Sequence, residues 1–345
     1  MEPMHHRSPI FARELASCLL AALATGLPPT VLAQSDPPLT LERCAAIGAS
    51  ADRLVCYDTL AGRAPAPADD DDTSFLSRFW ELEPQHKRGI FNFVGYQPNY
   101  VLPVHLTSRI NRAPQSTTQI PVPQPAYRTE EAKFQLSLRT KLVEDIGFEG
   151  ADVWVAFTQQ AMWQIYNGTD SKPFRNTDYQ PEVTYVVPTA ARLRKLPFEW
   201  QWRYTQIGLA HQSNGQSDPL SRSWNRVYLG AGFERSPWAL TARVNQRLNE
   251  PLASDNNPDL VTYRGRGEFQ LAWSGSLQTA SLQYRATLKD VKYGSLQLEW
   301  TYPVVNERPN GLRWFVQAFS GYGETLTDYN FRQTSIGAGL TFLQF

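Results

Sequence analysis

A histidine, a serine and an asparagine in the middle of the chain have the spacing of a hydrolytic triad. His211 and Ser213 are two residues apart, so on a β-strand their side chains would lie on the same face. Asn225 follows after a short loop, where its side chain could bond the second nitrogen of the imidazole. A serine becomes a nucleophile only with a base beside it, and the base needs a partner that holds its tautomer. Ser213, His211 and Asn225 are therefore candidates for the nucleophile, the base and the residue that orients the base.

The residues around this motif add to the chemistry but leave a simpler interpretation open. Gly215 has no Cβ, so its N–H could approach a developing oxyanion closely. A neutral asparagine stabilises an imidazolium less than a carboxylate would, so help from a cation or from backbone donors is expected. The simpler interpretation is that Ser213 and His211 are ordinary polar residues beside a turn. Spacing alone favours that interpretation, because His-x-Ser is a short and common pattern.

The segments that must carry these residues alternate between apolar and polar side chains. One of them has Trp238, Leu240, Ala242 and Val244 in alternation with Thr241, Arg243 and Asn245. Twelve such segments lie near residues 90–102, 131–144, 152–166, 179–190, 198–213, 223–235, 238–249, 260–274, 276–289, 293–304, 312–323 and 332–345. Alternation with period two predicts β-strands. The segments exceed the roughly five or six residues usual in a soluble sandwich and reach the ~9–11 residues that a tilted membrane strand needs.

The composition of the two strand faces favours a membrane barrel. One face is rich in charged and amide side chains, which is typical of a hydrogen-bonded or water-filled lumen. Aromatic residues close many segments, as at membrane interfaces. Backbone groups in lipid must pair within the protein, so the sheet has to close. We expect an all-β fold, a 12-stranded antiparallel transmembrane β-barrel formed by residues 86–345. A soluble exported esterase with a sandwich fold is the alternative.

The parity of the apolar residues predicts which face the triad occupies. Asn225 has the parity of Leu229, and His211 has the parity of Leu209, so both would face lipid. Trp202 has the opposite parity to Leu209, and a β-bulge near residue 205 would reconcile the two.

An amide on the lipid-facing stripe suggests a second copy of the chain. Gln159 has the parity of Val153, Val155 and Phe157. Burial against a symmetry mate would satisfy the amide, so Gln159 is a candidate for a homodimer interface. The alternative is that the strand has already left the hydrocarbon at this position.

The N-terminal part of the chain has the features of an exported protein. Residues 1–33 have the layout of a signal peptide, with basic residues ahead of an apolar run. Residues 34–85 are expected to form a periplasmic helical hairpin and an acidic linker. In an oxidising compartment Cys44 and Cys56 would form a disulfide, the alternative being two unrelated buried thiols. A formal net charge of zero gives no electrostatic footprint for nucleic acid.

The run from His211 to Arg226 reads H-x-S-N-G-x-S-D-P-x-S-R-S-W-N-R, which resembles the signature of the outer-membrane phospholipase A family. Similar stretches lie at residues 133–138, 163–164, 173–181, 255–259, 320–324 and 328–331. The resemblance implies a barrel in the outer membrane of Gram-negative bacteria that hydrolyses acyl esters of phospholipids and lysophospholipids, as a phospholipase A1 or A2. It also implies a need for calcium and activity as a homodimer. Without the resemblance, a barrel with no chemistry, such as a narrow channel or a structural pore, stays possible.

The resemblance assigns roles to the triad by position. Ser213 would be the nucleophile, His211 the base and Asn225 the residue that orients the base. The Gly215 amide would form the oxyanion hole together with a calcium-bound water.

The resemblance also implies a set of calcium ligands. The ion would bind the Gln216 carbonyl and the Ser221 hydroxyl, with Ser171 of the partner subunit as a further ligand. Such oxygens are the hard ligands that Ca²⁺ prefers. Gln216 stands where the family often has arginine, and Asn256 where an acidic residue would make a second calcium site, so the second site stays open.

Overall fold

The computed structural model describes residues 39–48, 50–62, 74–169, 171, 174–287 and 292–342. The chain divides into two compact units, Met1–Pro67 and Ala68–Phe345. The expected signal peptide and most of the expected acidic linker lie outside the described residues. Within the described ranges, no helix is both long and apolar enough to cross a membrane.

The first unit contains a small hairpin of two helices, α1 (Leu41–Ala45) and α2 (Ser50–Leu60). The side chain of Thr40 caps α1 by accepting a hydrogen bond from the Arg43 N–H at 3.3 Å. Cys44 and Cys56 are buried between the helices and form a disulfide, which confirms the predicted bridge. A hairpin this short has little core of its own, so the covalent link supplies much of its stability.

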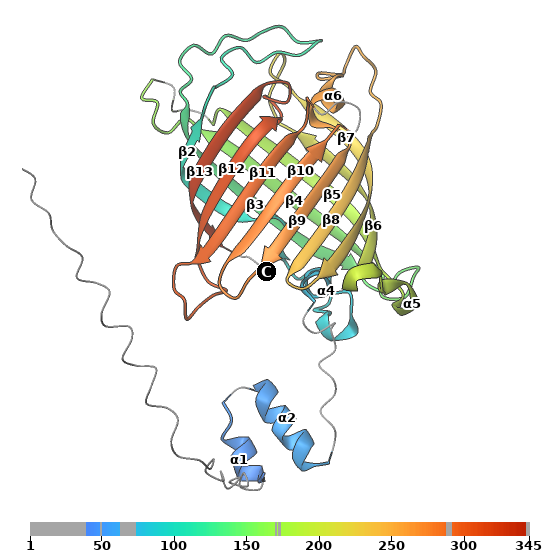
Figure 1. Ribbon diagram of the computed structural model, residues 1–345. Helices are drawn as coiled ribbons and strands as arrows, with labels where there is room; N and C mark the ends of the chain where they lie inside the picture. The colour runs from blue at the N-terminus through green and yellow to red at the C-terminus, as the bar shows by residue number, and fades with distance from the viewer. Residues whose placement is uncertain are drawn as a thin grey trace, which may run out of the picture. The chain divides into compact units, whose positions relative to one another are not determined.

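The second unit is a closed β-barrel (Figure 1). Its strands are β2 (Asn99–Thr107), β3 (Glu130–Val143), β4 (Asp152–Trp163), β5 (Asn176–Pro188), β6 (Gln201–Ser213), β7 (Ser223–Arg235), β8 (Trp238–Arg247), β9 (Gly267–Ser274), β10 (Thr279–Ala286), β11 (Ser295–Pro303), β12 (Arg313–Tyr322) and β13 (Arg332–Phe342). Each strand pairs antiparallel with its neighbours in sequence, and β13 pairs with β2 to close the barrel. The predicted 12-stranded antiparallel barrel is confirmed.

Two of the predicted strand boundaries differ from the observed ones. The segment predicted near 90–102 is split into a two-residue strand, β1 (Val94–Gly95), and β2. Pro98 lies between them and has no N–H, so it interrupts the ladder. The segment predicted near 260–274 begins with a helix, α6 (Leu260–Arg264), and only then enters β9. A short apolar run has no periodicity that separates helix from strand.

The two faces of the barrel differ as the alternation predicted. On β6 the side chains of Ala210 and Gln212 are buried, while Leu209 and His211 are exposed on the outer wall. The register of β6 against β7 shifts between Trp202 and Tyr204, so a bulge lies close to the position expected near residue 205. The bulge exchanges the faces, because one extra residue moves every following side chain to the other side.

A short helix, α4 (Phe75–Trp80), lies at one end of the barrel (Figure 1). Leu76 and Trp80 belong to a buried apolar cluster with residues of the barrel wall. Glu234, at the end of β7, caps the helix by accepting from the N–H groups of Phe75 at 2.6 Å and Leu76 at 3.4 Å. Residues from 74 onward therefore pack with the barrel, upstream of the boundary at residue 86 expected from the sequence.

Replacing Trp80 should test how much α4 stabilises the barrel. The Trp80 ring is 2 % exposed and its centroid lies 5.8 Å from those of Trp154 and Tyr204. Because Trp80→Ala leaves a large cavity, we expect the free energy of unfolding to fall by about 3–5 kcal/mol. The measurement is urea unfolding in lipid vesicles. Ile120→Ala, at a position 73 % exposed, is the control, and an equal effect of the two variants would contradict the packing role.

Candidate active site

Two neighbouring strands place the histidine and the asparagine opposite each other. β6 and β7 are antiparallel, and their register pairs His211 with Asn225 and Ser213 with Ser223. His211 Nδ1 lies 2.8 Å from Asn225 Oδ1, which is a hydrogen bond. Residues at paired positions project to the same face, so these four side chains lie on the outer wall of the barrel. The structure therefore brings the predicted base and its predicted orienting residue into contact.

The hydrogen bond determines which tautomer His211 adopts. An amide oxygen only accepts, so Nδ1 of His211 must carry the proton and donate to Asn225 Oδ1. Nε2 of the neutral ring is then an acceptor. A base that takes a proton from a serine needs this arrangement.

Ser213 ends β6 on the same face as His211 and is half-buried. Its Cα partners are Ser223 on β7 and Tyr179 on β5. Within the described part of the chain, no hydrogen bond joins the Ser213 hydroxyl to His211. Catalytic hydrogen bonds are often loose without substrate and tighten when it binds, so shared face and spacing are the relevant observations.

The loop between β6 and β7 is held by Asn214, which is buried. Its amide nitrogen donates to the Leu220 carbonyl at 2.8 Å, and its Oδ1 accepts from the Arg222 N–H at 2.9 Å and the Gln216 N–H at 3.3 Å. These three bonds substitute for a regular ladder across the loop. The side chain thereby holds the loop that follows Ser213 in a defined conformation.

Gly215 in this loop has a backbone conformation that other residues rarely adopt. Its φ is +63°, and a Cβ added there would lie 3.1 Å from Tyr179 Cε2. Both facts favour glycine, since an L side chain would be strained and would press on the tyrosine ring. The loop can therefore bring the main chain close to a group bound beside Ser213.

The predicted calcium ligands lie on two loops. Gln216 and Ser221 are on the β6–β7 loop, where Ser221 Oγ accepts a hydrogen bond from Asn256 Nδ2 at 2.8 Å. Ser171 is between β4 and β5, and its carbonyl accepts from Trp163 Nε1 at 2.8 Å. No hydrogen bond of the described residues connects Ser171 with the loop of Gln216 and Ser221. Hydroxyl and carbonyl oxygens fit a hard cation, but one chain supplies only part of a calcium shell.

The side chain of Asn256 lies where a second calcium site was left open by the sequence. An amide N–H of Gln119 points at it, whereas a cation would need oxygen ligands. Gln119 Nε2 donates to Asn256 Oδ1 at 2.9 Å and lies 3.4 Å from Asp218 Oδ1. Among the described residues no group of three or more His, Cys, Asp or Glu side chains could hold a metal ion. Asn256 Oδ1 and Asp218 Oδ1 therefore accept hydrogen bonds from the protein itself.

A buried cluster behind the site supports the end of the barrel. Trp224, next to Asn225 on the lumen face, packs with Leu260 and Tyr329. The Tyr329 hydroxyl donates to Asp259 Oδ1 at 2.5 Å. Burial, together with this hydrogen bond to Asp259, raises the pKa of Tyr329 above its ordinary value, so the hydroxyl stays protonated and keeps donating.

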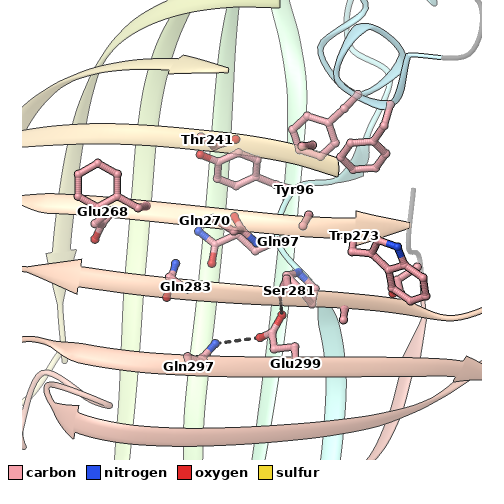
Figure 2. A pocket seen from close by; sticks show the side chains of 18 of the residues that line it. Tyr96, Gln97, Thr241, Glu268, Gln270, Trp273, Ser281, Gln283, Gln297 and Glu299 are labelled. Carbon is pink, nitrogen blue, oxygen red and sulfur yellow. Dashed lines mark hydrogen bonds between the residues drawn. The ribbon is translucent and has the colours of Figure 1, made fainter. Parts of the chain in front are cut away.

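A cavity inside the barrel lies away from these residues. It has a volume of about 260 Å³ and is lined by both polar and aromatic side chains, such as Gln283, Glu299 and Trp273 (Figure 2). Gln297 and Ser281 both donate to Glu299, at 2.8 Å and 3.1 Å. The cavity faces the inside of the barrel, whereas His211 and Asn225 face outward. The polar part of its lining belongs to the hydrogen-bonded lumen that the sequence predicted.

One neighbour of the pair was missed by the sequence analysis. Glu250 Oε1 accepts a hydrogen bond from Asn225 Nδ2 at 3.1 Å. Glu250 lies 25 positions after Asn225, just beyond the end of β8. Its place on the outward parity of β8 was a weak signal, but the pairing of β8 with β7 was needed to show the contact.

Comparisons with known sequences identify relatives over most of the chain. The profile of the phospholipase A1 family matches residues 76–342. A putative phospholipase A1 of Neisseria meningitidis serogroup B is 37 % identical over 274 residues, which cover 77 % of this chain and 69 % of that protein. The phospholipase A1 of Salmonella typhimurium is 32 % identical over 252 residues, which cover 72 % of this chain and 81 % of that protein.

Solved structures give the same result. An active-site mutant of outer membrane phospholipase A from Escherichia coli superimposes with a TM-score of 0.66 and 28 % identity, covering 79 % of this chain and all of that one. The calcium-bound dimer of the Salmonella typhi outer membrane phospholipase has a TM-score of 0.66 and 29 % identity, covering 78 % of this chain and 97 % of that one.

The fold and these relatives define the class of protein first: it is an outer-membrane β-barrel. The chain belongs to the phospholipase A1 family, and it is an enzyme that hydrolyses phospholipids. The resemblance found in the sequence is confirmed.

Replacing Gly215 should test the conformation of the loop beside Ser213. In Gly215→Ala the left-handed backbone becomes strained by about 1–2 kcal/mol, so we expect kcat for phospholipid hydrolysis to fall about tenfold. The measurement is fatty-acid release from mixed micelles. Gly168→Ala is the matched control, because a Cβ there meets nothing within 4 Å. Equal rates for the two variants would show that the loop conformation does not matter for turnover.

Proposed function

We propose that the protein is a calcium-dependent phospholipase A that cleaves acyl esters of phospholipids and lysophospholipids with Ser213, His211 and Asn225. The observation that carries the proposal is the 2.8 Å hydrogen bond between His211 Nδ1 and Asn225 Oδ1 on the outer wall. Leu209 on β6 and Leu229 on β7 are exposed apolar residues of the same outer face. An acyl chain in the membrane can reach a serine on that wall without leaving the hydrocarbon.

Each residue of the triad then has one task. His211 Nε2 accepts the Ser213 hydroxyl proton while Ser213 Oγ attacks the ester carbonyl. The proton passes to the departing alcohol oxygen, which leaves as a lysophospholipid, and the acyl group stays on Ser213. Water then attacks the acyl enzyme while His211 takes its proton, the bond to Ser213 Oγ breaks, and His211 returns the proton to Ser213 as the fatty acid leaves. Asn225 holds the ring with Nε2 toward Ser213 throughout. The related Escherichia coli structure is an active-site mutant in which asparagine is replaced by alanine, which supports this role.

The oxyanion that forms in both steps needs donors. The Gly215 N–H is the proposed donor, because the glycine follows Ser213 closely and its positive φ lets the backbone turn toward the site. A fixed donor stabilises the developing charge more strongly in a site that excludes water.

Calcium is proposed as the cofactor, held by the Gln216 carbonyl, the Ser221 hydroxyl and Ser171 of the partner subunit. The donor chemistry of these oxygens supports the assignment. The related Salmonella typhi structure is described as a dimer with bound calcium. When bound, the ion would supply positive charge near the reacting carbonyl.

A homodimer is proposed as the active form, with Gln159 at its interface. Gln159 pairs with Leu136 and Tyr179 across the wall, and Leu136 is exposed. An amide on an apolar outer wall lacks hydrogen-bond partners in lipid, and a second copy would provide them. We also propose that residues 1–33 are a signal peptide and that the disulfide-closed hairpin is periplasmic.

A channel function is less well supported than hydrolysis. Leu76 and Trp80 of α4 fill one end of the lumen, and Glu234 holds the helix there. A conducting pore would need this path open.

Removing the proposed nucleophile tests the enzyme directly. We expect Ser213→Ala to lower kcat for fatty-acid release by at least about 10³-fold, because the proposed nucleophile is lost. Ser223→Ala, directly opposite on β7, is the matched control and should retain turnover. Both variants should migrate as folded barrels when unheated samples are run on a denaturing gel. Hydrolysis that persists in folded Ser213→Ala would exclude the proposed nucleophile.

Calcium dependence tests the metal assignment. We expect a chelator to abolish fatty-acid release and added Ca²⁺ to restore it. Ser221→Ala should raise the Ca²⁺ concentration needed for half-maximal turnover by about 10- to 100-fold, since one ligand is lost. Ser217→Ala, an exposed serine of the same loop, should leave it unchanged. An unchanged calcium titration of Ser221→Ala would remove Ser221 from the ligand set.

A further inference from the structure

A carboxylate lies directly behind the asparagine of the His211–Asn225 pair. Asn225 Nδ2 donates to Glu250 Oε1 at 3.1 Å, while Asn225 Oδ1 accepts from His211 at 2.8 Å. Both ends of the amide are therefore bonded. The three side chains form a chain of hydrogen bonds along the outer wall, from β6 through β7 to the end of β8.

The barrel register brings Glu250 to this place. β7 and β8 pair Arg226 with Arg247, and the next backbone bond runs from Leu248 N–H to the Asn225 carbonyl at 2.8 Å. Leu248 is exposed on the outer wall, and Glu250 is two residues further on the same parity. The position is thus built by the third strand of the site and by the first residues after it.

The nearby arginine, Arg247, does not pair with Glu250. Arg247 is on the lumen parity, where it pairs with Asp255 at 2.7 Å. In the ranges that the structure describes, Glu250 forms no ion pair, and its hydrogen bond is to Asn225. A half-buried carboxylate beside an apolar wall keeps a strong field, because less water screens it.

The carboxylate decides how the amide is oriented. An ionised Glu250 can only accept, so it selects the NH₂ end of Asn225 and turns Oδ1 toward His211. In the opposite orientation the NH₂ group would face Nδ1, the ring would have to carry its proton on Nε2, and it could not act as a base toward Ser213. Through Asn225, Glu250 therefore favours the tautomer of His211 that has its proton on Nδ1 and can act as a base.

The carboxylate also supplies charge that the asparagine lacks. A neutral amide stabilises an imidazolium less than a carboxylate does. A hydrogen bond from Nδ2 to a carboxylate polarises the amide and makes Oδ1 a better acceptor, since bonds in a chain strengthen one another. The effect grows when His211 becomes positively charged, so it acts more on the transition state than on the bound substrate.

We propose that Glu250 is a positioning residue for hydrolysis, which orients and polarises Asn225 and so sets the tautomer of His211. This inference rests on the proposed triad. It assigns to this chain an acidic residue that acts through the asparagine and touches neither substrate nor histidine.

Substitution of Glu250 tests the proposal by its effect on kcat and KM separately. Glu250→Ala should lower kcat about 10- to 100-fold with KM within about twofold, because an interaction that grows in the transition state is lost. Glu250→Gln keeps the length and one acceptor but loses the charge, so its kcat should lie between those of the wild type and Glu250→Ala. Asn249→Ala, the exposed neighbour, is the control and should behave as wild type. Thermal unfolding and the calcium titration should be unchanged in all variants.

A double-variant cycle separates this proposal from that of the triad. If Glu250 acts through Asn225, adding Glu250→Ala to Asn225→Ala should lower kcat by less than about twofold further. Two outcomes would overturn the role of Glu250 and leave the triad standing. One is a full additional loss of kcat in the double variant. The other is wild-type kcat in Glu250→Ala when Asn225→Ala is slow. Wild-type turnover in Asn225→Ala would overturn the triad, and this inference with it.

Discussion

Every polar group of the backbone must find a partner within the protein when the chain lies in lipid, and the closed sheet of 12 strands follows from this constraint. Closure gives each strand one face toward hydrocarbon and one toward the lumen. The lumen can then hold charges only in partnered form, as where Glu324 accepts from Lys133 at 2.9 Å and from Ser335 at 2.9 Å. The outer wall, by contrast, is largely apolar, and any polar group there requires a particular reason.

That division of faces explains why the proposed site can lie on the outside. Enzyme sites are usually sought in pockets, but here the lumenal cavity is lined in part by hydrogen-bonded Gln and Glu side chains that hold the barrel together. His211 and Asn225 are instead held on the wall that acyl chains contact. Phospholipids surround the barrel in the membrane. They contact its outer wall directly, so a site for them needs no deep pocket.

Three consecutive strands build the candidate site, and the lumen face supports each of them. Asn214 holds the loop after β6, while Trp224 and its cluster pack beneath the start of β7. β8 contributes the carboxylate of Glu250 behind Asn225. Rigid strands with a buried support beneath them hold such groups within the small tolerances that proton transfer demands. The barrel is thus both the membrane anchor and the frame of the site.

The sequence by itself determined the barrel, its strand number and the outward face of His211 and Asn225, because side-chain alternation along a strand is a local property that period two reveals. It also contained the disulfide and, through a long motif, the family. It could not show that α4 enters the lumen under Glu234, nor that Glu250 bonds Asn225, since both contacts join segments whose pairing depends on the register of the closed sheet. Register and closure are collective properties of all the strands, and only the tertiary structure decided them.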